Sequence, residues 1–300
     1  YNVLFQEQNG SRSKAQIKAF EDTWRWDREA AEAYQQVVEA GGRVSRVMQA
    51  FRMFLGESDV LAYLAMMAPR LAELKRVLRS TGGIFLHCDT AASHYLKMLM
   101  DAVFGAQNFR NEISWRRSQT RSSISKVFKR QHDIMLFYTK TNDYHFYLQY
   151  KPLSEGSLKL YEHKDEHGSY QLVPLLVSGK RKGEIGESWR VIDPNKQGKA
   201  GMHWLTVPAK LGQYEKNGRV VWPKKEGGMP RLKYYLQDSK GVPVTDFWDD
   251  INVISSSSTE ALGYPTQKPE GLLQRIIKAC SEEGDTVLDP FCGCAGQGKE

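Results

Sequence analysis

The chain has 300 residues, enough for one large domain or two ordinary ones, and a formal net charge of +7 at pH 7, which favours an acidic partner such as nucleic acid. Charged residues at 26% and hydrophobic residues at 41% are typical of a soluble globular protein, and no apolar run is long enough to span a membrane. The four cysteines are too few for a disulfide framework, so we expect free thiols in a reducing, cytoplasmic compartment.

The first half of the chain alternates helical and strand patterns with tight connections. Residues 59–80 carry apolar side chains three and four positions apart, which predicts an amphipathic helix that Pro69 should kink or interrupt. A short apolar run at residues 84–89 predicts a buried strand. Asp89 or Thr90 can then cap the next helix. This alternation is typical of an α/β sheet.

The character of the sequence changes in the second half. From residue 146 to 246 helical periodicity fades and Gly, Pro, Lys and Trp become frequent, which predicts a separate, irregular, partly β region. A clear helical pattern returns after Pro269 and should close at Gly284. Further strands are predicted at residues 112–117, 133–140 and 286–289.

The last of these strands runs into a glycine-rich loop, "DPFCGCAG". Open α/β sheets bind ligands at the carboxyl ends of their strands, and Gly293 would let backbone N–H groups approach a ligand closely. The loop has neither the dinucleotide glycine pattern nor a Walker lysine. Alone, it predicts either a nucleotide-like cofactor site or an ordinary strand-to-helix turn.

The segment that precedes the loop makes the interpretation of the loop as a cofactor site more specific. "YPTQKPEGLLQRII" followed by "GDTVLDPFCGCAG" resembles the paired cofactor motifs of DNA amino-methyltransferases that carry an Asp-Pro-Pro-Tyr motif. The segments "GGIFLHCD", "NFRNEISWRR" and "HDIMLFYTK" resemble the permuted class, in which the catalytic motif comes first and the cofactor loop last. The resemblance implies S-adenosylmethionine as cofactor and the N6 amine of adenine in double-stranded DNA as methyl acceptor, after base flipping.

Three alternatives stay open at this point. The first is methylation of cytosine at N4, and the second is a DNA-binding relative without catalysis. The third is a different Rossmann-type enzyme that uses a dinucleotide, which the absent glycine pattern disfavours.

The resemblance also implies which residues hold the cofactor. Lys268 is suited to pair with the methionine carboxylate, and Phe291 offers an apolar face to the adenine. The full set comprises Tyr264, Thr266, Lys268 and Pro269 in the turn and Asp289, Pro290, Phe291, Cys292 and Gly293 in the loop.

The resemblance places the catalytic residues at the start of the chain. Tyr1 and Asn2 match the end of the catalytic motif, and Tyr1 would stack on the flipped base. We therefore expect a fragment cut inside both signature motifs, inactive alone because the acceptor carboxylate would precede Tyr1. A competing explanation makes "VLFQ" the remnant of a vector-encoded protease site.

By this resemblance the fold class is α/β, a Rossmann-like methyltransferase fold whose mostly parallel sheet has helices on both faces. Residues 1–145 would form the catalytic half, residues 146–246 an inserted target-recognition region, and residues 247–300 the cofactor-binding part.

Positive charge gathers in one segment, "RRSQTRSSISKVFKR", which contains no acidic residue. Contact with DNA phosphates and a solvated basic loop explain it equally well. The candidate DNA-binding residues are Arg116, Arg117, Arg121, Lys126, Lys129 and Arg130. Besides DNA, a restriction endonuclease subunit and a second copy of the chain are candidate partners. We expect no metal site, and interpret His87 as a packing residue.

Overall fold

The computed structural model describes residues 24–117, 126, 128–225, 228–255, 258–262 and 267–291. Its contacts divide the chain into two compact units. Unit 1 contains the described residues up to Gln149 and from Val244 onward, and unit 2 spans Tyr150–Pro243. No helix in these ranges is long and apolar enough to cross a membrane. The roles expected for residues 1–145, 146–246 and 247–300 stay predictions.

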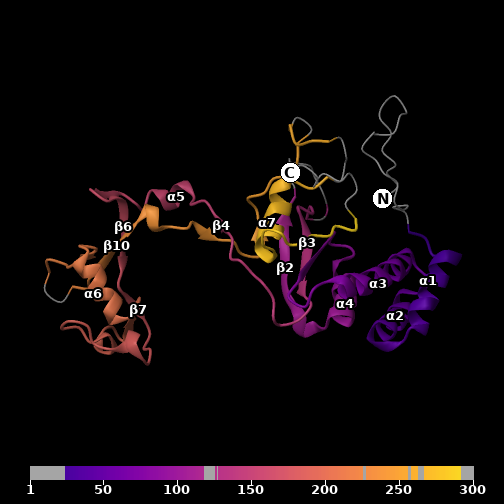
Figure 1. The fold of residues 1–300 in the computed structure, drawn as a ribbon, viewed down its shortest axis with the longest axis horizontal. Coiled ribbons are helices and arrows are strands. Elements are labelled where there is room, and N and C mark those ends of the chain that lie inside the picture. Colours follow the sequence, from indigo (N-terminus) through magenta and orange to yellow (C-terminus); the bar gives the residue numbers. More distant parts are fainter. Residues whose placement is uncertain are drawn as a thin grey trace. The chain divides into compact units, whose positions relative to one another are not determined.

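Four helices of unit 1 pack together over one face of its sheet (Figure 1). Two helices that the sequence patterns did not predict precede the helix predicted at residues 59–80. Asp27 caps the first by accepting a hydrogen bond from the Ala30 N–H at 2.9 Å. Side chains such as Phe51 and Leu64, both fully buried, form the shared core. The four helices are α1 (Arg28–Glu39), α2 (Gly42–Leu55), α3 (Asp59–Val77) and α4 (Ser93–Phe104).

Helix α3 continues through Pro69 without a break, so the predicted interruption is wrong. Proline lacks the N–H that would bond the carbonyl one turn earlier, which disfavours it inside a helix. Here Pro69 is exposed, whereas Leu64 and Leu71 on the opposite side are fully buried. Burial of that apolar face outweighs the missing hydrogen bond, because tertiary packing supplies most of the stability of a helix in a folded protein.

Replacing Pro69 by alanine is therefore expected to stabilise unit 1. A proline in a helix interior is about 3 kcal/mol less favourable than alanine, so we expect the free energy of unfolding to rise by about 1–3 kcal/mol. Denaturant unfolding followed by hydrogen exchange within residues 28–104 measures this. Glu73→Ala, at another exposed site of α3, should change stability by less than about 0.5 kcal/mol. An unchanged or less stable Pro69→Ala protein would contradict the interpretation.

The sheet of unit 1 has the strand order β1-β3-β2-β12. Strand β3 pairs antiparallel with both β1 and β2, and β12 pairs parallel with β2. Strands β1, β2 and β12 therefore run in one direction and β3 in the other. The bounds are β1 Gly83–Cys88, β2 Phe109–Arg116, β3 His132–Thr139 and β12 Phe247–Trp248.

A mostly parallel sheet was predicted, but most pairs between the described strands are antiparallel. The reason lies in the connection between β2 and β3. The chain leaves β2 at Arg116 and returns at His132 with no helix among the described residues between, so it comes back in the opposite direction. A parallel neighbour would have needed a crossover that carries the chain back to the starting edge. Because β3 lies between β1 and β2, one reversed strand makes two antiparallel pairs.

Alternate residues of β3 face the two sides of the sheet. Ile134, Leu136 and Tyr138 pack against the helices α1–α4, whereas Met135 and Phe137 face the opposite side. There they meet Leu272 of α7 (Glu270–Cys280), which Figure 1 shows alongside β2 and β3. The sheet is thus covered on both faces, and all of β3 after its first residue is buried.

The chain after α7 differs from its prediction. The helix ends at Cys280 rather than Gly284, and residues 286–289 form no strand. Val287 and Leu288 are 51% and 62% exposed. An isolated strand leaves its backbone groups unpaired, and no described strand pairs with this segment, so its strand propensity alone does not form one.

Unit 2 contains small sheets around its own core, in which Trp204 and Leu211 are buried. Its main sheet has the order β5-β6-β10-β9, and two further ladders pair β11 with β4 and β7 with β8. The strands are β4 Tyr150–Lys151, β5 His163–Asp165, β6 Gly168–Pro174, β7 Leu176–Ser178, β8 Met202–Trp204, β9 Val220–Val221, β10 Arg231–Tyr235 and β11 Val242–Pro243. The α-helices are α5 Glu155–Leu158 and α6 Pro208–Lys216.

Candidate functional site

The carboxyl edge of the unit 1 sheet gathers several charged side chains. Strands β1 and β2 end at this edge, and the reversed strand β3 begins there. Asp133 is the second residue of β3, opposite Trp115 of β2 and next to Ile134, which faces Cys88 of β1. Lys268, which precedes α7, lies close enough for its charge to act on Asp133. The structure thus brings one predicted cofactor residue to the edge where α/β sheets bind ligands.

The Asp133 carboxylate is the centre of this group. Its side chain is only 8% exposed. His87 Nε2 lies 3.1 Å from Oδ2, and Arg117 Nε lies 3.4 Å from Oδ1. Burial alone would raise the pKa of this carboxyl, but the hydrogen bond and charge of His87, with the charges of Arg117 and Lys268, outweigh it and hold the pKa below its ordinary value. Asp133 is therefore ionised at neutral pH.

Lys268 experiences opposing influences. Burial lowers the pKa of its ammonium, the Asp133 carboxylate raises it, and the Arg117 guanidinium lowers it, with a net decrease from the ordinary value. We call His87, Arg117, Asp133 and Lys268 the Asp133 cluster. It brings the Arg117 guanidinium and the Lys268 side chain together around one buried carboxylate.

Most members of the Asp133 cluster are not marked by a motif in the sequence. The sequence predicts a packing role for His87, but its imidazole forms a hydrogen bond with the Asp133 carboxylate. Asp133 was not singled out, although an aspartate next to a fully apolar run was a usable signal, since buried carboxylates need partners.

The predicted loop residues are described only in part. The Phe291 N–H donates to Asp289 Oδ1 at 3.0 Å, and the Phe291 ring packs against the core that α1–α4 share with β1 and β3. Pro269 stands immediately before α7, as predicted for the start of that helix. Pro290 is described and exposed. The remaining predicted residues lie outside the described ranges: Tyr1, Asn2, Tyr264, Thr266, Cys292 and Gly293.

The residues of the basic segment differ in their contacts and in their exposure. Arg116 donates from Nη2 to the Asp249 carbonyl at 2.5 Å, and Arg117 is held by Asp133. Lys126, Lys129 and Arg130 are exposed, while Arg121 lies outside the described residues. Contact of these residues with DNA stays a prediction, and within the described part of the segment the three exposed residues are its best-placed members.

Two cysteines are protected by their surroundings. Burial raises the pKa of the Cys88 thiol to about 12, reinforced by the nearby carboxylates of Asp89, Asp133 and Glu112. Burial likewise raises the pKa of the Cys280 thiol to about 12. Both thiols stay protonated at pH 8, and the protonated form is not the nucleophile.

Cys88 and Cys280 are consequently expected to react slowly with iodoacetamide at pH 8. Peptide-resolved mass spectrometry of the native protein should find both at least about tenfold less alkylated than in the urea-unfolded protein, because unfolding returns each thiol to an ordinary pKa. Rapid labelling of either cysteine in the native state would contradict its burial.

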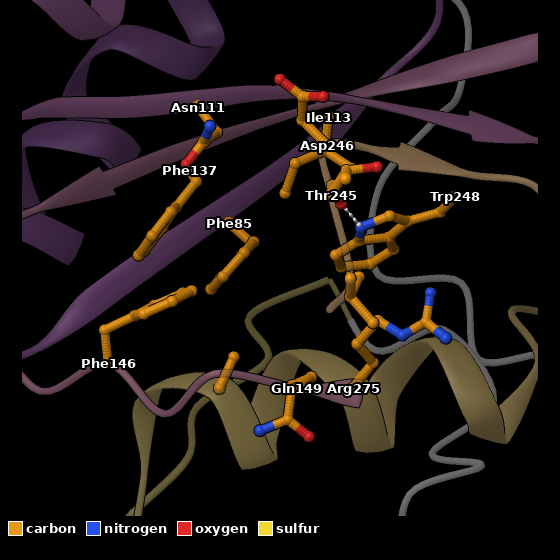
Figure 2. Close-up of a pocket in the computed structure, with 12 residues that line it drawn as sticks. Phe85, Asn111, Ile113, Phe137, Phe146, Gln149, Thr245, Asp246, Trp248 and Arg275 are labelled. Atoms are coloured by element: carbon orange, nitrogen blue, oxygen red, sulfur yellow. Dashed lines mark hydrogen bonds between the residues drawn. The ribbon is translucent and has the colours of Figure 1, made fainter. Parts of the chain in front are cut away.

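A pocket of about 300 Å³ lies elsewhere in unit 1, between the sheet and α7. Figure 2 shows the rings of Phe85, Phe137 and Phe146 on one side and Trp248 with Arg275 on the other. Phe85 and Phe137 stack with their centroids 4.3 Å apart. The pocket includes none of the predicted cofactor or DNA-binding residues. All of its lining residues belong to unit 1.

Metal binding finds no support in the described ranges, which contain no group of three or more His, Cys, Asp or Glu side chains able to hold an ion.

Comparisons with known proteins identify the family. A family model described as DNA methylase matches residues 6–296. The chain is 34% identical over 233 residues to the Type II methyltransferase M.EcaI of Enterobacter cloacae, covering 77% of this chain and 50% of that protein. It is 31% identical over 251 residues to the Mod subunit of the Type III restriction-modification enzyme StyLTI of Salmonella typhimurium, covering 79% and 37%.

A shorter match has a higher identity. Over 30 residues, which cover 10% of each chain, the sequence is 70% identical to the DNA adenine methyltransferase YhdJ of Escherichia coli. With an α/β unit that gathers charge at the carboxyl edge of its sheet, the chain belongs to the N6/N4 DNA methylase family. It spans half or less of the length of M.EcaI and of the StyLTI Mod subunit.

Proposed function

We propose that the protein containing this chain transfers a methyl group from S-adenosylmethionine to the N6 amine of adenine in double-stranded DNA. The family match supports the reaction class. One structural observation carries the cofactor assignment: Lys268 lies at the carboxyl edge of the sheet, near the Asp133 carboxylate and the Arg117 guanidinium. The printed name of YhdJ supports adenine, and N4 of cytosine is the alternative.

The strand directions also support a Rossmann-like methyltransferase fold. Strands β1, β2 and β12 run in one direction, with helices on both faces, as a Rossmann-like methyltransferase sheet requires. The reversed strand β3, which lies between β1 and β2, is the one described strand of this sheet that departs from the common direction.

The chemistry of methyl transfer to an exocyclic amine determines which groups the protein must supply. The lone pair of an exocyclic amine is delocalised into the base, so the amine attacks well only when held in line with the methyl carbon. In the transfer, a nitrogen–carbon bond forms, the carbon–sulfur bond breaks, S-adenosylhomocysteine leaves and the amine loses a proton. S-Adenosylmethionine supplies an electrophilic methyl group on a sulfonium. Lys268 would hold its carboxylate and Phe291 would lie against its adenine, while Tyr1 and Asn2 would meet the base flipped from the duplex.

The reaction can be tested with the full-length protein, plasmid DNA and isotopically labelled S-adenosylmethionine. Digestion to nucleosides and mass spectrometry should place the label in N6-methyldeoxyadenosine. Label in N4-methyldeoxycytidine would overturn the adenine assignment. DNA binding without label in either nucleoside would favour a non-catalytic relative.

A restriction partner is a second part of the proposal. One relative is by name the Mod subunit of a Type III restriction-modification enzyme. We propose that the protein acts beside a restriction endonuclease in the cytoplasm, and that a homodimer is its candidate assembly. Co-purification with a nuclease activity and the mass measured by light scattering test the two parts separately.

DNA contact by the exposed basic residues has a quantitative consequence. Replacing Lys126, Lys129 and Arg130 by alanine should reduce the slope of log affinity against log salt by about 2.7, since each lost phosphate contact contributes about 0.9. Fluorescence anisotropy on a short duplex at several salt concentrations measures this. The control is a triple alanine variant of three other exposed arginines, Arg43, Arg46 and Arg70. It removes the same number of positive charges and should leave the slope unaltered. Equal slopes for both triple variants would exclude a phosphate contact at residues 126–130.

A further inference from the structure

The excess positive charge of the chain lies entirely in unit 2. Within residues 150–243, lysine and arginine outnumber aspartate and glutamate by seven, which equals the formal net charge of +7 of the whole chain. Unit 1 therefore carries as many acidic as basic residues. A surface with an excess of cations attracts polyanions, and nucleic acid is the polyanion that a DNA methylase meets. The charge of unit 2 thus favours a nucleic-acid partner.

Unit 2 also presents one aromatic ring whose position is fixed by its neighbours. Trp222, which follows β9, stacks on the ring of Trp189 with centroids 5.6 Å apart and the ring planes 20° from parallel. Trp189 is buried and meets Trp204 of the unit 2 core edge-on. The Trp222 Nε1 donates to Glu215 Oε1 of α6 at 3.1 Å. Trp222 nevertheless remains 40% exposed, so the face of its indole opposite Trp189 is available to a ligand.

The Glu215 carboxylate that holds this indole is itself held by Arg190. Arg190 donates to Glu215 Oε2 from Nε at 2.9 Å and also from Nη2. Arg190 lies in a turn closed by backbone hydrogen bonds between Trp189 and Ile192, and its φ of 56° makes it the one described non-glycine residue with left-handed backbone. Such backbone is unfavourable for arginine and persists only where the surrounding contacts impose it. The indole of Trp222 is therefore oriented before any ligand arrives.

Positive charge lies beside the exposed ring. Lys224 and Lys225 come two and three residues after Trp222 and are exposed. Lys216, next to Glu215 at the end of α6, is exposed as well. An aromatic face with neighbouring cations suits single-stranded nucleic acid, because the ring stacks on a base while the cations meet phosphates. A base inside a duplex is already stacked on both sides, so only a base that has left its pair can use the ring.

We propose that the exposed face of Trp222 binds an unpaired nucleobase by stacking, with Lys224 and Lys225 at the adjoining phosphates. The inference rests on the proposed function in one respect, since extrusion of the target base is the step that leaves its partner base unpaired. Glu215 and Arg190 are positioning residues in this arrangement: they act through the indole and make no contact with the base.

Two probes and two substitutions test this role by fluorescence anisotropy on the full-length protein. The probes are a labelled oligothymidine of about 12 nucleotides and a fully paired duplex of the same length. Trp222→Leu keeps apolar bulk against Trp189 but has no ring, and should bind the single strand roughly tenfold more weakly. Trp222→Phe loses the same hydrogen bond to Glu215 but keeps a ring, and should lose less than about threefold. Both should bind the duplex within about threefold of the unchanged protein.

The salt dependence separates stacking from charge. Trp222→Leu should leave the slope of log affinity against log salt unaltered on the single strand. Alanine at both Lys224 and Lys225 should reduce that slope by about 1.4, since each phosphate contact on a single strand contributes about 0.7. Phe54→Leu is the matched control, because Phe54 is an aromatic residue of unit 1 that is 59% exposed, and its loss should change neither affinity nor slope.

Three outcomes would overturn the inference alone. They are unchanged single-strand affinity in Trp222→Leu, equal losses in Trp222→Leu and Trp222→Phe, and equal losses by Trp222→Leu on the single strand and the duplex. Binding of the duplex without the single strand by the unchanged protein would also exclude a site for an unpaired base, while DNA binding stands. If the unchanged protein binds neither probe, the proposed function fails and the inference with it.

Discussion

Replacing Lys268 by methionine is expected to weaken binding of S-adenosylhomocysteine by roughly 100-fold, and DNA methylation at limiting cofactor in proportion. Methionine keeps the length and apolar stem of the side chain but removes the charge that would pair with the ligand carboxylate. Burial lowers the pKa of the Lys268 ammonium, whereas the Asp133 carboxylate raises it. The loss should appear in the cofactor KM more than in the rate at saturation, because the carboxylate is remote from the transferred methyl group.

Titration calorimetry with the purified full-length variant measures this effect. Lys278→Met is the matched control: Lys278 is an exposed lysine of α7, and its loss removes the same charge without touching the cluster. The control should bind the ligand as the unchanged protein does. Equal affinities for Lys268→Met and Lys278→Met would remove Lys268 from the cofactor site.

Replacing Trp204 by alanine is the second large effect, and it is expected to destabilise unit 2 by about 3–5 kcal/mol. The indole is 1% exposed, donates from Nε1 to the Glu187 carbonyl at 2.8 Å, and meets Trp189 edge-on with centroids 5.5 Å apart. Its removal leaves a cavity among Leu175, Leu211 and Leu232 and an unsatisfied carbonyl. For a unit of this size, the loss corresponds to a decrease in Tm of roughly 12–40 °C.

Hydrogen exchange resolved by peptide separates the two units in this experiment. Amides within residues 150–243 should exchange much faster in Trp204→Ala, whereas α3 and β3 in unit 1, which has its own cores, should keep their protection. Binding of S-adenosylhomocysteine should persist, since Lys268 lies in unit 1, while DNA methylation should fall if unit 2 recognises the target. Trp222→Ala, at a side chain 40% exposed, should cost about 1 kcal/mol or less. Loss of protection throughout both units would contradict their independence.

Elements with strong local signals were predictable from the sequence. The strand at residues 84–89 and those near residues 112–117 and 133–140 correspond to β1, β2 and β3. The Asp89 carboxylate accepts hydrogen bonds from the N–H groups of Ala91 and Ala92 in the turn before α4. The N-cap of α4 is Ala92, without a side-chain hydrogen bond, so the predicted capping of this helix by Asp89 or Thr90 is wrong. That helix ends at Gly105, whose φ of 94° suits glycine. Capping groups and periodicity act within a few residues, so they can be recognised without knowing what the chain packs against.

Predictions that depended on distant partners succeeded less often. The apolar segment 286–289 has the composition of a strand but no partner among the described strands. Pro69 ought to break a helix, yet burial of Leu64 and Leu71 keeps α3 whole. In both cases the contribution of the surrounding structure exceeds the local preference, which amounts to a few kcal/mol at most.

For the site, the sequence by itself determined the family, because the two motifs of the resemblance are contiguous stretches of residues whose spacing can be recognised directly. The role of Lys268 in cofactor binding stays a prediction from the same motifs. Only the tertiary structure decided that Asp133, His87 and Arg117 accompany this lysine. They come from three different strands or strand ends, and the reversed direction of β3 between β1 and β2 brings them together. A charge at one sequence position gives no sign of its counter-ion in another strand, since pairing is set by strand order and register.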